Sequence, residues 1–286
     1  MTNMTTNNLK FPSTRSMLRT LVKNSFKAID EGMYEINGDR EYTNHTCISL
    51  RNNILKCKQN PLLTEIKYAS PSNGTLVDDN EVKVEEIATI MEKAGAIGIS
   101  ILAQPYLFNG SIGNILRARK HVTVPILMKD IIVSDIQIKA AKKAGADCIL
   151  LIKTVFDANL SEGNLETLAE YAKKIGLEVI LETHNEVEFN ETIKSNSKLN
   201  KPFSIVGINN RNLSTLEVNL DTTVRILSEV SKNDNIVISE SGIKEPKDIR
   251  KLKSAGADAF LIGTTLMEKS KEMGQKIKEL VDSSVK

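Results

Sequence analysis

The chain has 286 residues, of which 41% are hydrophobic and 26% are charged, so it can bury a sizeable core as one large α/β domain or as two average domains. A formal net charge of only +2 argues against a strongly basic nucleic-acid-binding protein, and 4% aromatic residues without any Trp argue against stacking platforms for single strands. No apolar run reaches membrane-spanning length, so we expect neither nucleic acid nor a membrane as a partner, whereas a small anionic substrate remains possible.

The N-terminus and the cysteines indicate a cytoplasmic protein. Residues 1–16 are polar and lack the apolar segment of a signal peptide. Cys47, Cys57 and Cys148 form no CxxC motif, which favours reduced thiols. The histidines are His45, His121 and His184. None of them forms a metal-type pair with another His or Cys, so we expect no metal site and regard each as a surface or packing residue.

Residues 1–46 predict an N-terminal extension that is partly helical, ahead of a catalytic domain at residues 47–286. We expect the first dozen residues to be frayed. Residues 15–29 and 47–58 are apolar at helical spacing. These helices are expected to pack on the domain, and the alternative is that they cover its active site.

The first predicted strand, residues 62–67, raises a question about its charges. Leu62, Leu63 and Ile66 indicate a buried strand, yet Glu65 and Lys67 lie on one side of it, two residues apart. A structural ion pair would explain them. A pocket that faces an anionic ligand is the other explanation.

A phrase that predicts a helix-to-strand junction recurs along the chain. In "KKAGADCILLI", a Lys-rich segment ends before Gly, and a short apolar run follows. Cationic residues suit a helix C-terminus, Gly adopts the left-handed position after it, and the apolar run is typical of a strand buried on both faces. The copies are at residues 91–102, 142–152 and 253–263, with a weaker one at 172–182.

These junctions predict eight alternating strands and helices. The predicted strands are residues 62–67, 97–103, 125–129, 146–152, 178–182, 203–208, 235–240 and 257–262. The predicted helices between and after them are residues 82–94, 110–122, 134–144, 162–175, 185–195, 217–231, 245–255 and 267–281. This series favours an α/β fold of the (β/α)8 TIM-barrel type. A doubly wound sheet is the competitor, but the chain has no GxGxxG or GxxxxGK[ST] loop.

Charged and polar side chains follow most of the predicted strands. They are Glu65, Lys67, Lys129, Asp130, Glu182, Asn209, Arg211, Glu240 and Ser241. Active sites of such barrels lie at the carboxyl ends of the strands, and interior charge is costly unless it is paired or functional. We therefore predict that these groups converge on one active-site rim, and structural ion pairs are the weaker alternative.

The ends of the seventh and eighth predicted strands indicate a phosphate site. "SESGI" at residues 239–243 and "LIGTTL" at 261–266 place Gly beside hydroxyl groups. Backbone N–H groups of such loops, with the N-terminus of a short helix, can hold a phosphate. Either loop alone could be ordinary turn chemistry, but the two would lie side by side in the barrel.

At six strand ends the sequence resembles the indole-3-glycerol-phosphate synthase family. The matching segments are "EIKYASPSNG" (65–74), "ILMKDIIV" (126–133), "ILETHNE" (180–186), "VGINNRNLSTLEV" (206–218), "VISESGI" (237–243) and "GADAFLIGTTLM" (256–267). The match runs in order from about residue 47 to about residue 270, which covers nearly all of the predicted barrel. Six motifs in sequence are highly specific, whereas one AGAD…IG segment would fit many phosphate-binding barrels.

The resemblance implies a reaction. The family closes the pyrrole ring of 1-(2-carboxyphenylamino)-1-deoxyribulose 5-phosphate to indole-3-glycerol phosphate in tryptophan biosynthesis, with loss of carbon dioxide and water and without a metal or organic cofactor. A cationic acid must protonate the carbonyl oxygen while the aromatic carbon attacks. The substrate carboxylate must be held until it leaves, and a hydroxyl group is then eliminated with acid and base help.

The resemblance also implies roles for individual residues. Lys129 would be the general acid of ring closure, Lys67 would pair with the substrate carboxylate and serve as acid in the dehydration, and Glu182 would be the opposite acid–base partner. Glu65 would orient the lysines and balance their charge. The remaining implied roles are Asn209 and Arg211 for the substrate carboxylate and hydroxyls, Ser241 for the ribulose chain, Phe108 and Leu213 for the anthranilate ring, and Ser70, Gly242, Gly263 and Thr264 for the phosphate.

Five positions depart from the pattern of the family. Ala103-Gln104 stands where Thr and an acid are usual, so a carboxylate that could tune a lysine is missing. Tyr68 replaces a common basic residue, Asn212 a common Asp, and Ile131 a frequent Phe. None of these changes removes a principal catalytic residue, so they bear on rate and substrate fit more than on reaction class.

Two other functions stay open from the sequence. A related phosphate-binding barrel such as phosphoribosylanthranilate isomerase uses a Cys or Asp acid–base pair, and Lys67 and Lys129 argue against it. A paralogue that binds a phosphate ester without turnover is the other alternative. We expect the chain to act on the small phosphorylated anthranilate–ribulose substrate as a monomer or weak homo-oligomer.

Overall fold

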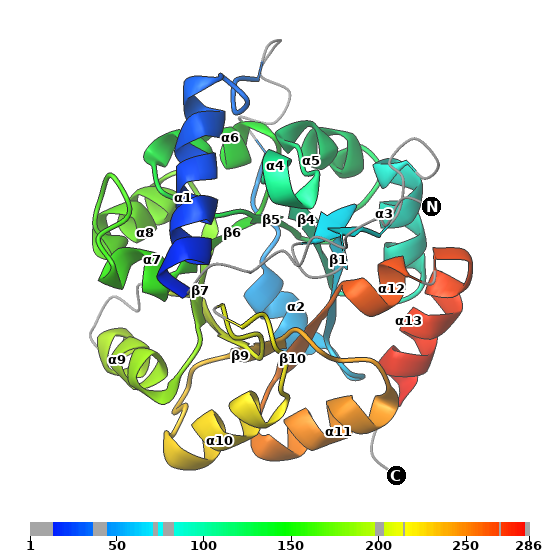
Figure 1. The fold of residues 1–286 in the computed structure, drawn as a ribbon. Helices are drawn as coiled ribbons and strands as arrows, with labels where there is room; N and C mark the ends of the chain where they lie inside the picture. Colours follow the sequence, from blue (N-terminus) through cyan, green and yellow to red (C-terminus); the bar gives the residue numbers. More distant parts are fainter. Residues whose placement is uncertain are drawn as a thin grey trace, which may run out of the picture.

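Eight parallel strands close into a barrel (Figure 1). The computed structural model describes residues 14–36, 45–70, 74–76, 83–197, 203–213, 215–268 and 270–283. In order around the barrel the strands are β1 (Leu62–Ile66), β4 (Gly98–Leu102), β5 (Ile126–Lys129), β6 (Cys148–Ile152), β7 (Glu178–Thr183), β8 (Ile205–Asn209), β9 (Val237–Glu240) and β10 (Ala259–Ile262), which pairs with β1. The predicted (β/α)8 barrel is confirmed, and each strand end lies within two residues of its prediction.

Helices surround the barrel on its outside (Figure 1). The main ones are α3 (Val84–Lys93), α5 (Ile112–Arg119), α6 (Asp135–Lys143), α8 (Leu165–Lys174), α9 (Glu186–Asn196), α10 (Asp221–Glu229), α11 (Pro246–Ala255) and α13 (Met273–Asp282). The shorter elements are α4 (Pro105–Phe108), α7 (Lys153–Asp157), α12 (Thr264–Met267), the 3₁₀ helix η1 (Ser270–Glu272) and the paired strands β2 (Ala69–Ser70) and β3 (Gly74–Thr75). The sequence patterns did not predict α4, α7 or the β2–β3 pair.

The two N-terminal helices lie at opposite ends of the barrel (Figure 1). α1 (Thr14–Asp30) borders the carboxyl ends of the strands and contributes Leu21 to the pocket there. α2 (Leu50–Lys56) covers the other end, where Asn53 Nδ2 donates to the Ile97 carbonyl at 3.0 Å. The expectation that the first dozen residues are frayed falls outside the described residues, as do residues 37–44 of the predicted extension.

The repeated junction has the predicted left-handed glycine. The glycines and their φ angles are Gly95 (102°), Gly145 (83°), Gly176 (80°) and Gly256 (109°). In the two copies that read AGAD, the Asp accepts the backbone N–H that opens the preceding strand. Asp147 accepts from Ile126 at 2.7 Å, and Asp258 accepts from Val237 at 2.8 Å. The repeated segment therefore ends each helix and also holds the amino ends of the barrel strands in place.

A buried contact ties the segment after α1 to the loop after β5. The Tyr34 hydroxyl donates to Asp130 Oδ2 at 2.5 Å, and Gln137 Nε2 donates to the Tyr34 oxygen at 3.2 Å. Burial raises the pKa of Asp130 to about 6. Because Asp130 directly follows Lys129, this contact holds α1 beside the residue that the sequence predicts as the general acid.

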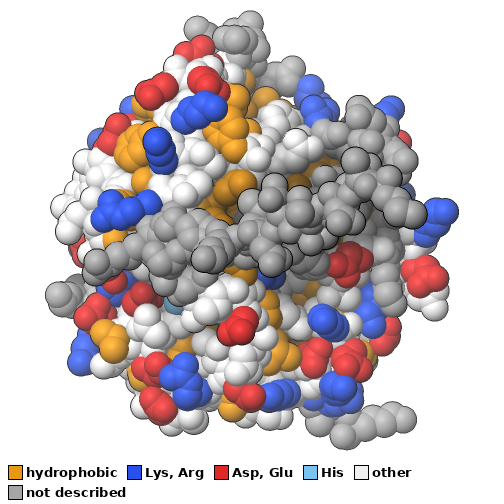
Figure 2. Space-filling view, viewed as in Figure 1, with side chains coloured by type: hydrophobic (Ala, Val, Ile, Leu, Met, Phe, Trp, Pro, Cys, Tyr) orange, Lys and Arg blue, Asp and Glu red, His pale blue; other side chains and the backbone are white. Residues whose placement is uncertain are grey.

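The described surface carries charges of both signs. Figure 2 shows Lys and Arg side chains interspersed with Asp and Glu around the edge of the face seen in Figure 1. This mixture agrees with the net charge of +2. In the part of the chain that the structure describes, no helix has the length and apolar character needed to cross a membrane.

Candidate active site

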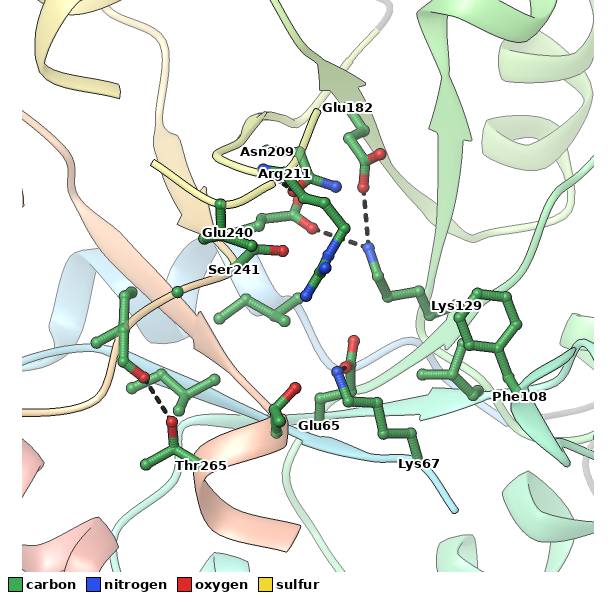
Figure 3. A pocket seen from close by; sticks show the side chains of 18 of the residues that line it. Glu65, Lys67, Phe108, Lys129, Glu182, Asn209, Arg211, Glu240, Ser241 and Thr265 are labelled. Carbon is green, nitrogen blue, oxygen red and sulfur yellow. Dashed lines mark hydrogen bonds and ion pairs between the residues drawn. The ribbon is translucent and has the colours of Figure 1, made fainter. Parts of the chain in front are cut away.

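A pocket of about 950 Å³ lies at the carboxyl ends of the barrel strands. The predicted site residues that line it are Glu65, Lys67, Phe108, Lys129, Glu182, Asn209, Arg211, Leu213, Ser241, Gly242, Gly263 and Thr264. Ser70 does not line the pocket, and it lies in β2, where it pairs with Gly74 of β3. Figure 3 shows charged side chains from β1, β5, β7 and β9 converging on one space.

Lys129 stands at the centre of a buried charge cluster. Its Nζ lies 2.9 Å from Glu182 Oε2 and 2.8 Å from Glu240 Oε2 (Figure 3). Lys129 ends β5, Glu182 lies in β7 and Glu240 ends β9, so the barrel alone brings the three together. The side chains are 16%, 3% and 2% exposed, respectively. One cation therefore faces two carboxylates in a poorly solvated site, where their proton affinities depend strongly on each other.

The two carboxylates on Lys129 differ in proton affinity. Burial opposes the charge of Glu182, but Lys129 and His184 outweigh it and hold the pKa of Glu182 well below its usual range. Burial raises the pKa of Glu240 to about 7, and the charge of Glu182 adds to this rise while Lys129 opposes it. Burial also opposes the charge of Lys129, but the surrounding carboxylates hold its pKa above its usual value. Acids separated in this way can divide the roles of base and acid.

Glu65 and Lys67 form a second charged pair at the carboxyl end of β1. Lys67 Nζ lies 2.8 Å from Glu65 Oε1, and both side chains line the pocket. Burial lowers the pKa of Arg211, and the charge of Glu65 opposes that change. The ion pair that the sequence left open is therefore present, and it faces a space that a ligand can enter.

The loop after β8 presents Arg211 to the middle of the pocket (Figure 3). The Arg211 backbone N–H donates to Asn209 Oδ1 at 3.0 Å, and the Arg211 guanidinium donates to the Leu216 carbonyl at 2.9 Å. Arg211 also pairs with Val218 in an antiparallel bridge. These contacts fix the guanidinium in place before any ligand arrives, which reduces the ordering cost of binding.

The two loops predicted to hold a phosphate line the same pocket. Ser241 and Gly242 have φ angles of 70° and 88°. A Cβ on Gly242 would lie 2.4 Å from Val218 Cγ1, so only glycine fits there. Thr265 Oγ1 donates to the Ile243 carbonyl at 2.9 Å and links the loop after β10 to the loop after β9. The side-by-side arrangement of the loops is thus as predicted, and phosphate binding stays a prediction.

Gly263 controls the position of Glu65. A Cβ at Gly263 would lie 2.5 Å from Glu65 Oε1 and 3.0 Å from Glu65 Cβ, and Glu65 is 3% exposed and cannot move into solvent. We expect Gly263→Ala to displace Glu65 together with its partner Lys67, and to lower kcat/KM about 10²-fold, the cost of a misplacement of about 1 Å. Steady-state kinetics would measure the effect.

The matched control for that substitution is Gly274→Ala in α13. There a new Cβ would meet only Ile90 Cγ2, at an ordinary contact distance of 3.5 Å. This control should retain wild-type kcat/KM. Wild-type kinetics in Gly263→Ala would contradict the role given to the Glu65–Lys67 pair.

Apolar side chains line the remaining wall of the pocket. The predicted pair Phe108 and Leu213 is joined by Leu21 of α1, by Ile131 and by Leu216. Ile131 replaces the Phe that the family often has, and it keeps this wall apolar. Such a surface suits a flat aromatic ring, which gains free energy from leaving water.

Gln104 shows what the missing acid after the second barrel strand does in this chain. Its Oε1 accepts from the Leu107 backbone N–H at 3.0 Å and caps the N-terminus of α4. The side chain is fully buried and lines the pocket. An amide can cap α4 as a carboxylate would, so this departure preserves the loop that carries Phe108.

Three residues of the site were not assigned from the sequence. Glu240 was noted only as a strand-end acid, since its role depends on its distance from Lys129. His184 was regarded as a surface or packing residue, but its Nε2 lies 3.1 Å from Glu182 Oε1. Asn210 Nδ2 donates to the carbonyls of Glu240 and Ser241 at 3.0 and 3.1 Å and so fixes the loop after β9. A charged or amide residue next to a strand-end motif was the available signal in all three cases.

The described part of the chain shows neither a candidate metal site nor a cysteine that lines the pocket. Within residues 14–36, 45–70, 74–76, 83–197, 203–213, 215–268 and 270–283, no group of three or more His, Cys, Asp or Glu side chains could hold a metal ion. The three cysteines are free thiols, and burial raises the pKa of Cys47 to about 11. Neither Cys47 nor Cys148 lines the pocket.

Comparison with known proteins gives a consistent result. The sequence model of one family, described as indole-3-glycerol phosphate synthase, matches residues 18–280. The indole-3-glycerol phosphate synthase of Sulfurisphaera tokodaii is 45% identical over 223 residues, which cover 78% of this chain and 83% of that protein. The protein of the same name from Methanocaldococcus jannaschii is 36% identical over 265 residues, which cover 92% of each chain.

Two solved structures share the fold at low sequence identity. An N-acetylmannosamine-6-phosphate 2-epimerase from Clostridium perfringens superposes with a TM-score of 0.57 at 14% identity, covering 85% of this chain and all of that one. A thiamine phosphate pyrophosphorylase from Pyrococcus furiosus has a TM-score of 0.53 at 16% identity, covering 81% and 96%. These similarities show the barrel fold alone.

Proposed function

Because the chain belongs to the indole-3-glycerol phosphate synthase family, we propose that its barrel pocket is the site where 1-(2-carboxyphenylamino)-1-deoxyribulose 5-phosphate is closed to indole-3-glycerol phosphate. The enzyme is a carboxy-lyase of tryptophan biosynthesis, and each turnover releases carbon dioxide and water. The contacts of the pocket support one assignment of the individual steps.

The substrate would lie across the pocket with its phosphate at the loops after β9 and β10. Ser241, Gly242, Gly263 and Thr264 line that side, and Ser70 is left out of the set because it does not line the pocket. The anthranilate ring would lie on the apolar wall. The positive charges of Lys67 and Arg211 would hold the substrate carboxylate, and Asn209 would position the hydroxyls.

Ring closure would take its proton from Lys129. The aromatic carbon that carries the carboxylate attacks the carbonyl carbon, and the carbonyl electron pair moves to the oxygen, which receives a proton from Lys129 Nζ. The bond to the carboxylate then breaks, and its electrons restore the aromatic ring. The carboxylate enters as an anion and leaves as neutral carbon dioxide, so this half of the reaction consumes one proton.

Dehydration would use the opposite pair of groups. The hydroxyl leaves as water with a proton from Lys67, while Glu182 accepts the proton that the new ring gives up. Glu65, at 2.8 Å from Lys67, would orient that lysine and balance its charge. Protons given and taken balance in this half of the reaction.

The single observation that carries this assignment is the position of Lys129. Its ammonium group lies between Glu182 and Glu240, at 2.9 and 2.8 Å, in the pocket that Phe108 also lines (Figure 3). An ammonium group in this position can donate a proton to a carbonyl oxygen, and a neighbouring acid can then reprotonate the amine.

Turnover of the carboxyphenylamino substrate tests the function directly. Purified protein should produce a rise in indole fluorescence and one equivalent of carbon dioxide per indole product, and the same mixture with Lys129→Met protein should react at least about 100-fold more slowly. Binding of the substrate without fluorescence or gas release would contradict the proposal.

We further propose that residues 47–286 form the catalytic domain behind an extension at 1–46, and that the enzyme works in the cytoplasm as a monomer or weak homo-oligomer. Free cysteines support a reducing compartment. Sedimentation at working concentration would measure the oligomeric state.

A further inference from the structure

His184 lies behind the active site, in contact with Glu182. Its Nε2 is 3.1 Å from Glu182 Oε1, whereas Lys129 Nζ is 2.9 Å from the other oxygen, Glu182 Oε2. The His184 side chain is 11% exposed and does not line the pocket. Glu182 is therefore held from both sides, with a pocket lysine on one oxygen and a histidine on the other.

The far side of the His184 ring is fixed by α7 and α9. Thr154 Oγ1 lies 3.3 Å from Nδ1, and Glu188 Oε2 lies 3.6 Å from it. Glu188 is itself held, because its Oε1 accepts from Thr154 at 3.0 Å and its Oε2 accepts from the His184 backbone N–H at 2.9 Å. Among the described residues, the charged groups in contact with His184 are thus two carboxylates, Glu182 from β7 and Glu188 from α9.

These two carboxylates favour the imidazolium form of His184. Burial opposes its charge, but the contacts with Glu182 and Glu188 raise the pKa of His184 to about 9. Burial likewise opposes the charge of Glu188, but His184 outweighs it and lowers the pKa of that acid. At neutral pH, Glu182 therefore lies between two cations.

Glu240 has a different environment. Lys129 contacts its Oε2 at 2.8 Å, and among the described residues its buried Oε1 has no hydrogen-bond partner. That oxygen packs on Gly207, where a Cβ would lie only 2.3 Å away. Glu65 of β1 adds a third negative charge near Lys129. Glu240 thus shares one cation with other acids, while Glu182 has two.

We propose that His184 is a positioning residue that holds Glu182 as an anion and so leaves the shared proton of the Glu182–Lys129–Glu240 cluster on Glu240. The inference rests on the function proposed above, because ring closure takes a proton from Lys129. Once Lys129 has given its proton to the carbonyl oxygen, protonated Glu240 returns one to the neutral amine and becomes a carboxylate. Solvent then reloads Glu240, which supplies the one proton that each turnover consumes.

The proposal sets the direction of the pH dependence. Burial raises the pKa of Glu240 to about 7, so Glu240 is protonated below that pH and is increasingly ionised above it. Turnover should therefore fall as the pH rises through about 7. Without the charge of His184, Glu182 would compete for the proton, and Glu240 would ionise at a lower pH.

The first test is the pH profile of His184→Asn, with His121→Asn as the matched control because His121 is exposed on the turn after α5. We expect kcat to fall about 10- to 100-fold, as for a displaced catalytic group. The alkaline limb should move down by about one pH unit. KM should stay nearly unchanged, because His184 does not reach the pocket. Glu188→Gln should shift the limb the same way by a smaller amount, and His121→Asn should match the wild type.

A second measurement does not depend on turnover. Carbon NMR of protein labelled at the glutamate carboxyls, with the Glu240 signal assigned by its loss in Glu240→Gln, should show titration near pH 7 and a lower midpoint in His184→Asn. An unmoved Glu240 midpoint in a folded variant would overturn the proposal. If His184→Asn does not fold, Glu188→Gln and Thr154→Val make the same comparison. A shifted midpoint in protein that forms no indole product would uphold the proton assignment and reject the enzymatic function.

Discussion

Lys129→Met is expected to lower kcat for ring closure by about 10²–10⁴-fold, the usual contribution of a positioned general acid. Methionine keeps the length of the side chain, so the loss reports the missing proton and charge more than a cavity. The substitution also leaves Glu182 and Glu240 facing each other without the cation that now lies 2.9 and 2.8 Å from them. Stopped-flow fluorescence of indole product at saturating substrate would measure kcat.

Lys129→Arg separates proton donation from charge. Arginine keeps a cation that can pair with the two carboxylates, but it hardly ever gives up its proton. If Lys129 acts as an acid, Lys129→Arg should be nearly as slow as Lys129→Met. A recovery to within about tenfold of wild-type kcat would instead assign Lys129 an electrostatic role. The control is Lys139→Met, an exposed lysine of α6 that pairs with its helix neighbour Asp135 and lies over the Tyr171 ring outside the pocket, and it should leave kcat unchanged.

The barrel could be predicted from the sequence because its strands are short and mostly apolar. β1, β4, β6 and β8 are buried along their whole length, and most of their residues are apolar, without a regular apolar–polar alternation. Helix ends are marked by Lys and a left-handed Gly. These local signals do not depend on tertiary contacts, which is why the predicted strand ends agree closely with those of the structure.

α4, α7 and the β2–β3 pair escaped prediction for a related reason. They are four, five and two residues long, too short to show a period. The side chain of Gln104 caps the N-terminus of α4, and no pattern of apolar residues in the sequence predicts that contact.

The candidate site was predictable where position along a strand decides it. In a parallel barrel every strand ends at the same face, so Lys129 and Glu182 had to meet once the strands were correct. The same logic could not give roles to Glu240 or His184. Whether an acid beside a lysine is ionised depends on distances of about 3 Å and on a second charge behind it, and the linear sequence contains neither.

The opposite end of the barrel carries charge for stability instead of chemistry. Asp147, at the start of β6, is fully buried and accepts from the backbone N–H groups of Ile48 and Ile126, each at 2.7 Å. Arg119 donates to it at 2.8 Å, and His45 Nε2 lies 2.7 Å away. Unlike the Lys129 cluster, whose Glu240 oxygen is unpartnered among the described residues, this carboxylate has a partner on every side. A buried carboxylate whose two oxygens both have partners stabilises the structure. A carboxylate with an unpartnered oxygen beside a pocket can instead exchange protons.

Asp147→Asn should therefore lower the free energy of unfolding by about 3–5 kcal/mol, since it leaves the Arg119 guanidinium, 3% exposed, without its counter-charge. The new amide group would also face N–H donors that need an acceptor. Urea unfolding would measure the loss, and Asp234→Asn, on an exposed loop, should cost less than about 0.5 kcal/mol. The folded variant should keep wild-type kcat, because Asp147 does not line the pocket. A loss below about 1 kcal/mol, or a fall in kcat at unchanged stability, would contradict the division of labour between the two ends of the barrel.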